Sequence, residues 1–140
     1  MMADTLTSER RSWNMSRIRG RDTAPEMLLR SLLHRAGFRF RLHARQLPGR
    51  PDVVLPRYRA AIFVHGCFWH RHPGCRNATT PTTRREFWQE KFDDNVSRDV
   101  RNRIALEAAG WTVHTVWECE LKADAENVVR RLTNELRGGG

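Results

Sequence analysis

Residues 65–75 read HGCFWHRHPGC, a segment with three histidines, two of the three cysteines and two large aromatic residues. Cys67, His72 and Cys75 are spaced so that a short loop could wrap around one tetrahedral zinc ion. Structural zinc sites have four protein ligands, and the remaining cysteine, Cys119, is the candidate for the fourth position. Zinc would then tie a distant strand end to this loop. The alternative is a polar loop whose cysteines are incidental.

The composition indicates a small protein with a polyanionic partner. A chain of 140 residues is long enough for one domain with a single core, but too short for two. The net charge of +9 and the pI near 11.0 favour nucleic acid, although ribosomal and membrane-surface proteins share such a charge. Arginine supplies nearly all of the basic residues, which suits bidentate contacts to phosphate or guanine. A GC-rich genome would produce the same bias.

The number of cysteines and the hydropathy of the chain indicate its cellular compartment. Three cysteines cannot form a closed disulfide framework, which points to a reducing environment. No apolar run approaches the roughly 20 residues of a membrane span, and no signal peptide is visible. We therefore expect a cytoplasmic protein.

The chain divides into a basic arm and one folded domain. Residues 1–22 are polar and arginine-rich, and we expect this arm to become ordered on DNA; the alternative is a disordered solubilising tail. Residues 23–140 form the domain. Its first helix is predicted from Asp22 or Thr23 to about Ala36, where Gly37 ends it. The predicted buried residues of this helix are Leu28, Leu29, Leu32, Leu33 and Ala36. Glu26 lies on the inward edge.

The remaining elements alternate between strands and helices. Strands are predicted at 38–43, 51–55 and 58–65, a loop over 66–80, and a long helix from about Thr83 to about Gly110. A strand over 111–117 and a helix over 124–136 follow. One side of the long helix should carry Trp88, Phe92, Asn95, Val96 and Asp99. This order predicts an α/β fold in which a mixed sheet is flanked by helices.

A Pro-Asp pair at the start of one strand suggests a magnesium site. Asp52 would project from the sheet edge and bind a hard cation through its carboxylate, which could then position water for attack on a phosphate. A Pro-Asp pair of this kind occurs in many Mg²⁺-dependent nucleases. Most of them carry Glu-x-Lys on the next strand, but here the corresponding residues are 63–65, FVH. Val64 can offer only its backbone carbonyl, and Glu26 is the candidate for a second carboxylate. A Pro-Asp pair is also a common start of a turn.

Two histidines could supply acid–base chemistry. His65 and His70 have reference pKa values near neutrality, and Asp99, on the inward side of the long helix, could orient one of them. The alternatives are that His65 is a structural histidine at a strand end and that Asp99 is a solvated helix charge. Because the candidates converge on one end of the sheet, each strengthens the others.

Several stretches resemble one known family, the very-short-patch repair (Vsr) endonucleases. They are NMSRIR at 14–19, DTAPE at 22–26, GRPD at 49–52, FVHGCFWH at 63–70, EFW at 86–88, NV at 95–96, RD at 98–99 and WEC at 117–119. The resemblance implies a restriction-endonuclease-like fold with a structural zinc site. It also implies a Mg²⁺-dependent endonuclease that nicks one DNA strand 5′ to the mispaired thymine of a T·G mismatch.

The resemblance also implies roles for individual residues. Asp52 and the Val64 carbonyl would bind magnesium, with the rest of the catalytic site formed by Glu26, His65, His70 and Asp99. The zinc ligands would be Cys67, His72, Cys75 and Cys119. The aromatic residues Phe68, Trp69 and Trp88 would wedge into the base stack beside the mismatch. Trp88 could instead be a core residue.

The expected partner is double-stranded DNA that contains a T·G mismatch, bound by a monomer with no membrane contact. Such mismatches arise when 5-methylcytosine deaminates, so a cytosine-5 DNA methyltransferase and mismatch-repair proteins would be functional neighbours in the bacterial cytoplasm, on the nucleoid. Two other functions stay open: a restriction-like nickase of matched or modified sites, and a zinc-stabilised DNA-binding module without catalysis.

Overall fold

The centre of the molecule is strand β3, Ala60–His65, in a computed structural model that describes residues 23–138. On one side β3 pairs antiparallel with β2, Val53–Leu55, and β2 pairs antiparallel with the two-residue β1, Arg41–Leu42. On the other side β3 pairs in parallel with β4, Thr112–Trp117, along its whole length. The result is a four-stranded mixed sheet of order β1-β2-β3-β4.

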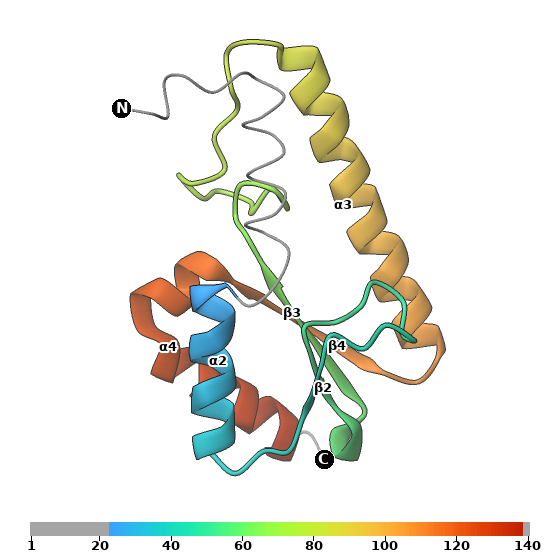
Figure 1. The fold of residues 1–140 in the computed structure, drawn as a ribbon, viewed down its shortest axis with the longest axis vertical. Helices are drawn as coiled ribbons and strands as arrows, with labels where there is room; N and C mark the ends of the chain where they lie inside the picture. Colours follow the sequence, from blue (N-terminus) through green and yellow to red (C-terminus); the bar gives the residue numbers. More distant parts are fainter. Residues whose placement is uncertain (1–22, 139–140) are drawn as a thin grey trace.

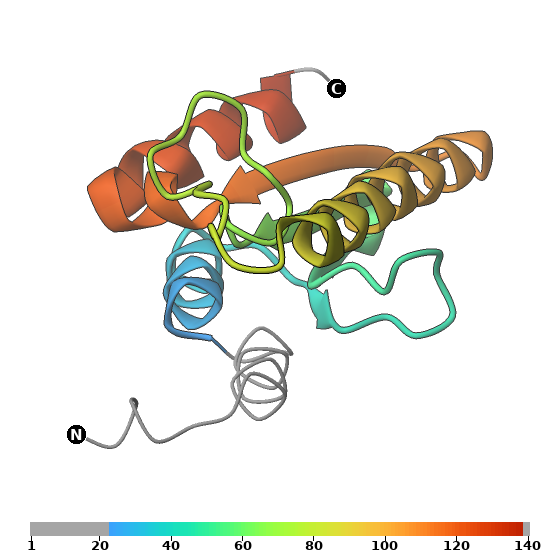
Figure 2. The same ribbon diagram turned by 90° about the horizontal axis from the view of Figure 1, so that it is seen from above.

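The helices lie on two sides of this sheet. The 24-residue helix α3, Arg85–Ala108, is the crossover that a parallel β3–β4 pair requires. Helices α2, Ala24–Arg35, and α4, Glu118–Thr133, pack against each other on the side away from α3 (Figures 1 and 2). Alternate residues of β3 point to the two sides, because Ala60 and Ile62 belong to the core cluster beneath α2 and α4. Phe63 and His65 instead line a cavity beside α3.

Local chemistry sets the limits of helix α2. The Thr23 hydroxyl accepts a hydrogen bond from the Glu26 backbone N–H at 3.4 Å, and Pro25 lies in the first turn. Gly37 follows the C-cap with φ of +94°, a left-handed conformation that ends the helix. The predicted helix and its inward Glu26, which is only 3% exposed, are therefore confirmed. Leu28 was predicted to be buried and is 42% exposed, because the core stripe runs through Leu29 and Leu33.

Other predicted bounds need correction. The predicted strand over 38–43 pairs only at Arg41–Leu42, since Phe38 turns into the core and contacts Tyr58 edge to face. Between β2 and β3 the predicted turn is a 3₁₀ helix, η2, Pro56–Tyr58. Val96 was predicted on the inward side of α3 and is 40% exposed, because Phe92 and Asn95 occupy the buried positions.

The C-terminal helix begins earlier than predicted. Helix α4 starts at Glu118, directly after β4, and bends at Asp124, whose φ of −162° and ψ of 82° are not helical. The Asp124 carboxylate accepts the Asn127 N–H at 3.1 Å, so the second part has its own cap at the predicted start. A π-helical turn, η3, Asn134–Gly138, ends the described chain. Within residues 23–138, no helix is long and apolar enough to cross a membrane.

Candidate active site

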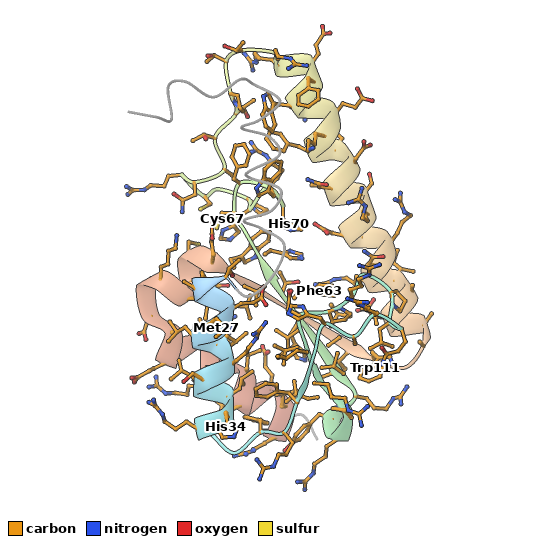
Figure 3. All side chains as sticks on the ribbon, viewed as in Figure 1. Met27, His34, Phe63, Cys67, His70 and Trp111 are labelled. Carbon is orange, nitrogen blue, oxygen red and sulfur yellow. The ribbon has the colours of Figure 1, made fainter. Side chains whose placement is uncertain are left out.

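A cavity of about 480 Å³ lies between the β2–β3 hairpin and helix α3. Its lining includes the four predicted residues Asp52, His65, His70 and Asp99, together with Val64. These residues come from three different parts of the chain, so the cavity exists only when the β2–β3 hairpin and α3 are in place. In Figure 3, His70 and Cys67 lie at the upper end of β3, above Phe63.

The Asp52 side chain is hydrogen-bonded to the neighbouring strand, β3. Its Oδ2 accepts a hydrogen bond of 2.7 Å from the Val64 backbone N–H, which fixes the carboxylate beside the end of β3. Burial, with a smaller contribution from the charge of Glu26, raises the pKa of Asp52 to about 7, against the opposing effects of the Val64 N–H and Arg30. A carboxylate that is costly to ionise in isolation is stabilised when a cation binds beside it, which suits a metal ligand.

Two further side chains surround Asp52. Glu26 and His43 each place a ligand atom within 4.8 Å of the others and of the Asp52 carboxylate, so the three residues could hold a metal ion. Glu26 was predicted for this position. His43 was not, although it directly follows β1, which pairs with the strand after Asp52. The sequence signal that could have identified His43 is its place in the short segment opposite the Pro-Asp pair.

The two cavity histidines are stacked. The rings of His65 and His70 lie 3.9 Å apart with an interplanar angle of 6°. His70 Nδ1 lies 2.7 Å from Asp99 Oδ2, as expected for a carboxylate that orients an imidazole. Burial, and then the charge of His70, lowers the pKa of His65 to about 3, so this imidazole stays neutral at physiological pH. The pair therefore combines a neutral ring with one that a carboxylate can stabilise in its charged form.

The three cysteines meet with one histidine next to this cavity. Ligand atoms of Cys67, His72, Cys75 and Cys119 all lie within 4.8 Å of one another, and this set, the thiol cluster, could hold a metal ion. The Cys119 Sγ is 3.4 Å from His72 Nδ1, and the His72 ring stacks on Trp117 at 4.2 Å. Burial raises the pKa of the Cys67 thiol to about 12, so metal binding would have to displace its proton. Three thiolates and one imidazole fit tetrahedral zinc.

The predicted intercalating residues form an aromatic cluster. Phe68 contacts Trp69, Trp88 and Phe92 edge to face, with ring centroids 5.1, 5.8 and 5.1 Å away. Phe68 and Trp88 are partly exposed, whereas Trp69 is buried with 6% exposure, and Asn95 donates a hydrogen bond of 3.2 Å to its backbone carbonyl. The cluster therefore belongs in part to the local core between the loop and α3.

Arg71, which the sequence analysis did not single out, organises the loop after β3. Its guanidinium donates hydrogen bonds to the carbonyls of Phe68, Ala78 and Thr79 at 3.2, 2.9 and 2.9 Å. The same group lies 3.9 Å from the centroid of the Phe92 ring. A single side chain thus joins both ends of the loop to helix α3.

The chain is similar to known proteins along most of its length. Residues 3–76 match a family model described as DNA mismatch endonuclease Vsr. The chain is 49% identical over 135 residues to the type II nicking enzyme V.XorIIP of Xanthomonas oryzae, covering 96% of this chain and 98% of the relative. It is 47% identical over 135 residues to the DNA mismatch endonuclease Vsr of Escherichia coli, covering 96% of this chain and 86% of the relative.

A third relative, the type II nicking enzyme V.NmeAIP of Neisseria meningitidis, is 40% identical over 138 residues, covering 97% of this chain and 98% of the relative. These likenesses extend over nearly the whole chain, so they are not confined to the loop that carries the cysteines. The protein is a DNA endonuclease. It belongs to the Vsr family of DNA mismatch endonucleases.

Proposed function

We propose that this endonuclease uses Mg²⁺ to nick one DNA strand 5′ to the mispaired thymine of a T·G mismatch, the product of 5-methylcytosine deamination. The observation that carries the proposal is that one cavity is lined by Asp52, His65, His70 and Asp99 together. The name of the E. coli relative, DNA mismatch endonuclease, supports a mismatch as the substrate. We also propose that the mixed sheet and its helices are of the restriction-endonuclease type.

Asp52 is the proposed anchor of the magnesium ion, with the Val64 carbonyl as a second ligand. When bound, Mg²⁺ would lower the pKa of a coordinated water and offset charge on the reacting phosphate. The Val64 N–H holds one oxygen of Asp52, which leaves the carboxylate in a fixed orientation toward the cavity. The Glu26 carboxylate lies within reach of the same position.

His70 is the proposed general acid or base. Asp99 binds its Nδ1, so the proton on that nitrogen is held and Nε2 is the atom that can exchange a proton in the cavity. His65 stacks against this ring and stays neutral, which restricts the orientation of His70 without adding charge. In this assignment His65 is a positioning residue, and His70 transfers the proton.

Zinc in the thiol cluster would be structural. Its ligands come from the loop after β3 and from the first turn of α4, which follows β4. A four-ligand set leaves no open position for substrate, as expected of a site that stabilises a fold. The loop that it would hold carries His70 and two of the proposed intercalating residues, so its role is to keep them in position.

Phe68, Trp69 and Trp88 are proposed to wedge into the base stack beside the mismatch. Unstacking costs a few kcal/mol and costs less at a mismatched pair than at a matched one. Phe68 and Trp88 are partly exposed and could enter first, whereas Trp69 supports them from the buried side of the cluster.

Residues 1–22, which lie outside the described part of the chain, are proposed to become ordered on DNA, with residues 23–140 as the single endonuclease domain. The enzyme is proposed to act as a monomer on nucleoid DNA in the bacterial cytoplasm. A cytosine-5 DNA methyltransferase and mismatch-repair proteins are the proposed functional neighbours.

A nicking assay tests the function directly. A labelled T·G duplex and its matched T·A control are incubated with the protein and Mg²⁺ or EDTA, and products are resolved by strand. Mg²⁺-dependent cleavage of the thymine strand, confined to the T·G duplex and lost in Asp52→Ala, is expected. Equal cleavage of T·A would favour a nickase of matched sites, a possibility raised by relatives named type II nicking enzymes. Binding without cleavage would favour a non-catalytic DNA-binding module.

A further inference from the structure

A positively charged side chain lies between two of the candidate metal ligands. The Arg30 guanidinium forms an ion pair with the Glu26 carboxylate, one helical turn earlier on α2. The same nitrogen, Nη2, lies 2.9 Å from Nε2 of His43. Arg30 therefore contacts two of the three residues whose ligand atoms converge beside Asp52.

The chemistry of Arg30 determines the state of His43. A guanidinium stays charged and can only donate hydrogen bonds, so His43 Nε2 must be the acceptor and its proton must be on Nδ1. The lone pair that could bind a metal ion is thus already directed at Arg30. Glu26 is in the same situation, because its Oε2 accepts a hydrogen bond from the same Arg30 nitrogen.

Burial makes this arrangement persistent. The side chain of Arg30 is 12% exposed and that of Glu26 is 4% exposed, so water competes little for either group. A buried charge pair that also satisfies a neighbouring imidazole is costly to separate. The cation between Glu26 and His43 is consequently part of the folded protein.

We propose that Arg30 is a fixed cation of the active site, which occupies the position where a second, exchangeable divalent ion would otherwise bind between Glu26 and His43. The inference rests on the proposed function, in which Asp52 binds the catalytic metal ion. Arg30 is then a positioning residue: it neutralises Glu26 and holds His43, so that within this three-residue cluster Asp52 is the carboxylate available to magnesium.

Removal of the guanidinium should uncover a metal site. In Arg30→Met the Glu26, His43 and Asp52 ligand atoms remain close together, and two carboxylates with an imidazole form a ligand set for Mn²⁺. Mn²⁺ is the suitable probe because it prefers oxygen and nitrogen ligands and competes poorly for the thiol cluster. Binding is measured on zinc-loaded protein without DNA, from the electron paramagnetic resonance signal of free Mn²⁺ and by calorimetry.

We expect Arg30→Met to bind one more equivalent of Mn²⁺ than the parent. The extra ion should bind at least about tenfold more tightly than any Mn²⁺ bound by the parent, because the charge and number of ligands set such affinities. His43→Gln in the Arg30→Met background should remove this gain. Arg30→Lys keeps a fixed cation and should bind as the parent does. Arg35→Met, which removes an exposed arginine from the same helix, is the matched control and should also bind as the parent does.

Circular dichroism and zinc content verify that each variant folds, and Arg30→Gln replaces Arg30→Met if the latter does not. An equal Mn²⁺ count and affinity in the parent and the neutral variant would overturn the inference, as would an extra equivalent in Arg30→Lys. If neither neutral variant folds, two Mn²⁺ equivalents in the parent would overturn it, and one at most would support it. Failure of the proposed function is separate, since it appears as nicking by Asp52→Ala.

Discussion

Replacement of Asp99 by asparagine should impair nicking without affecting the fold. Asp99 Oδ2 lies 2.7 Å from His70 Nδ1, and the two side chains are 26% and 19% exposed, so solvent screens the pair only in part. A carboxylate can only accept, which holds the His70 proton on Nδ1 and leaves Nε2 available in the cavity. The substitution Asp99→Asn keeps the size of the side chain but introduces an NH₂ group, which can donate to Nδ1 and so favour the wrong tautomer of His70.

The size of the effect follows from this hydrogen bond. A bond between a charged carboxylate and an imidazolium contributes about 1.5–3 kcal/mol, which corresponds to about 10- to 100-fold in rate if it is lost only in the transition state. A tautomer change adds to this loss and can bring it to about 10⁴-fold, as in triads where a carboxylate orients a histidine. We therefore expect the nicking rate to fall by about 10²- to 10⁴-fold.

The assay is single-turnover nicking of a labelled T·G duplex at saturating enzyme and Mg²⁺, across a pH series, with duplex affinity measured by fluorescence anisotropy. Asp94→Asn removes an exposed carboxylate from the same helix and is the matched control. Binding, thermal stability and zinc content should match the parent in both variants. A rate for Asp99→Asn within about threefold of the parent at every pH would refute the assignment of His70 and Asp99 as an acid–base pair.

Three further perturbations have defined outcomes. Burial raises the pKa of Asp52 from 3.8 to about 7, so the folded state binds this proton more tightly, and stability is lost as pH rises through that window. Asp52→Asn should therefore raise the free energy of unfolding of the metal-free protein by roughly 2–4 kcal/mol at about pH 8, with no gain below about pH 4. Urea unfolding at each pH measures this difference. An equal gain at both pH values would contradict a raised pKa of Asp52. Cys119→Ala should lower zinc content measured by mass spectrometry and reduce the melting temperature strongly, because structural zinc contributes on the order of 10 kcal/mol in small sites; full stability with no zinc would exclude a structural role. Arg71→Ala should cost about 1–3 kcal/mol, since it leaves several loop carbonyls without their donor, whereas Arg76→Ala, an exposed change in the same loop, should cost little.

The predictions of the ends of α2 and of the central strand were confirmed, because they depended on the chemistry of a few neighbouring residues. Thr23, Pro25 and Gly37 set the ends of α2 by backbone chemistry that acts within a few residues, and the apolar run of β3 indicated a central strand. The convergence of Asp52 with the cavity histidines was also predictable, because adjacent strands bring their ends together.

What the sequence could not supply depends on contacts between distant elements. His43 reaches Glu26 and Asp52 only because β1 pairs with β2, and a two-residue strand leaves almost no periodic signal. The buried positions of α3 were predicted from spacing alone, but spacing does not reveal how wide the buried stripe is, and Val96 lies just outside it. Trp69 was expected at the DNA surface, but it is buried and its ring contacts those of Phe68 and of Trp88 on α3.

With zinc bound as proposed, the thiol cluster would also act as a cross-link in polymer terms. Cys67 and Cys119 are about 50 residues apart, and a permanent link over such a span lowers the conformational entropy of the unfolded chain by an amount equivalent to about 4 kcal/mol. All of α3 and β4 lies inside that loop. If zinc binds there as proposed, the population of folded enzyme follows the free zinc concentration.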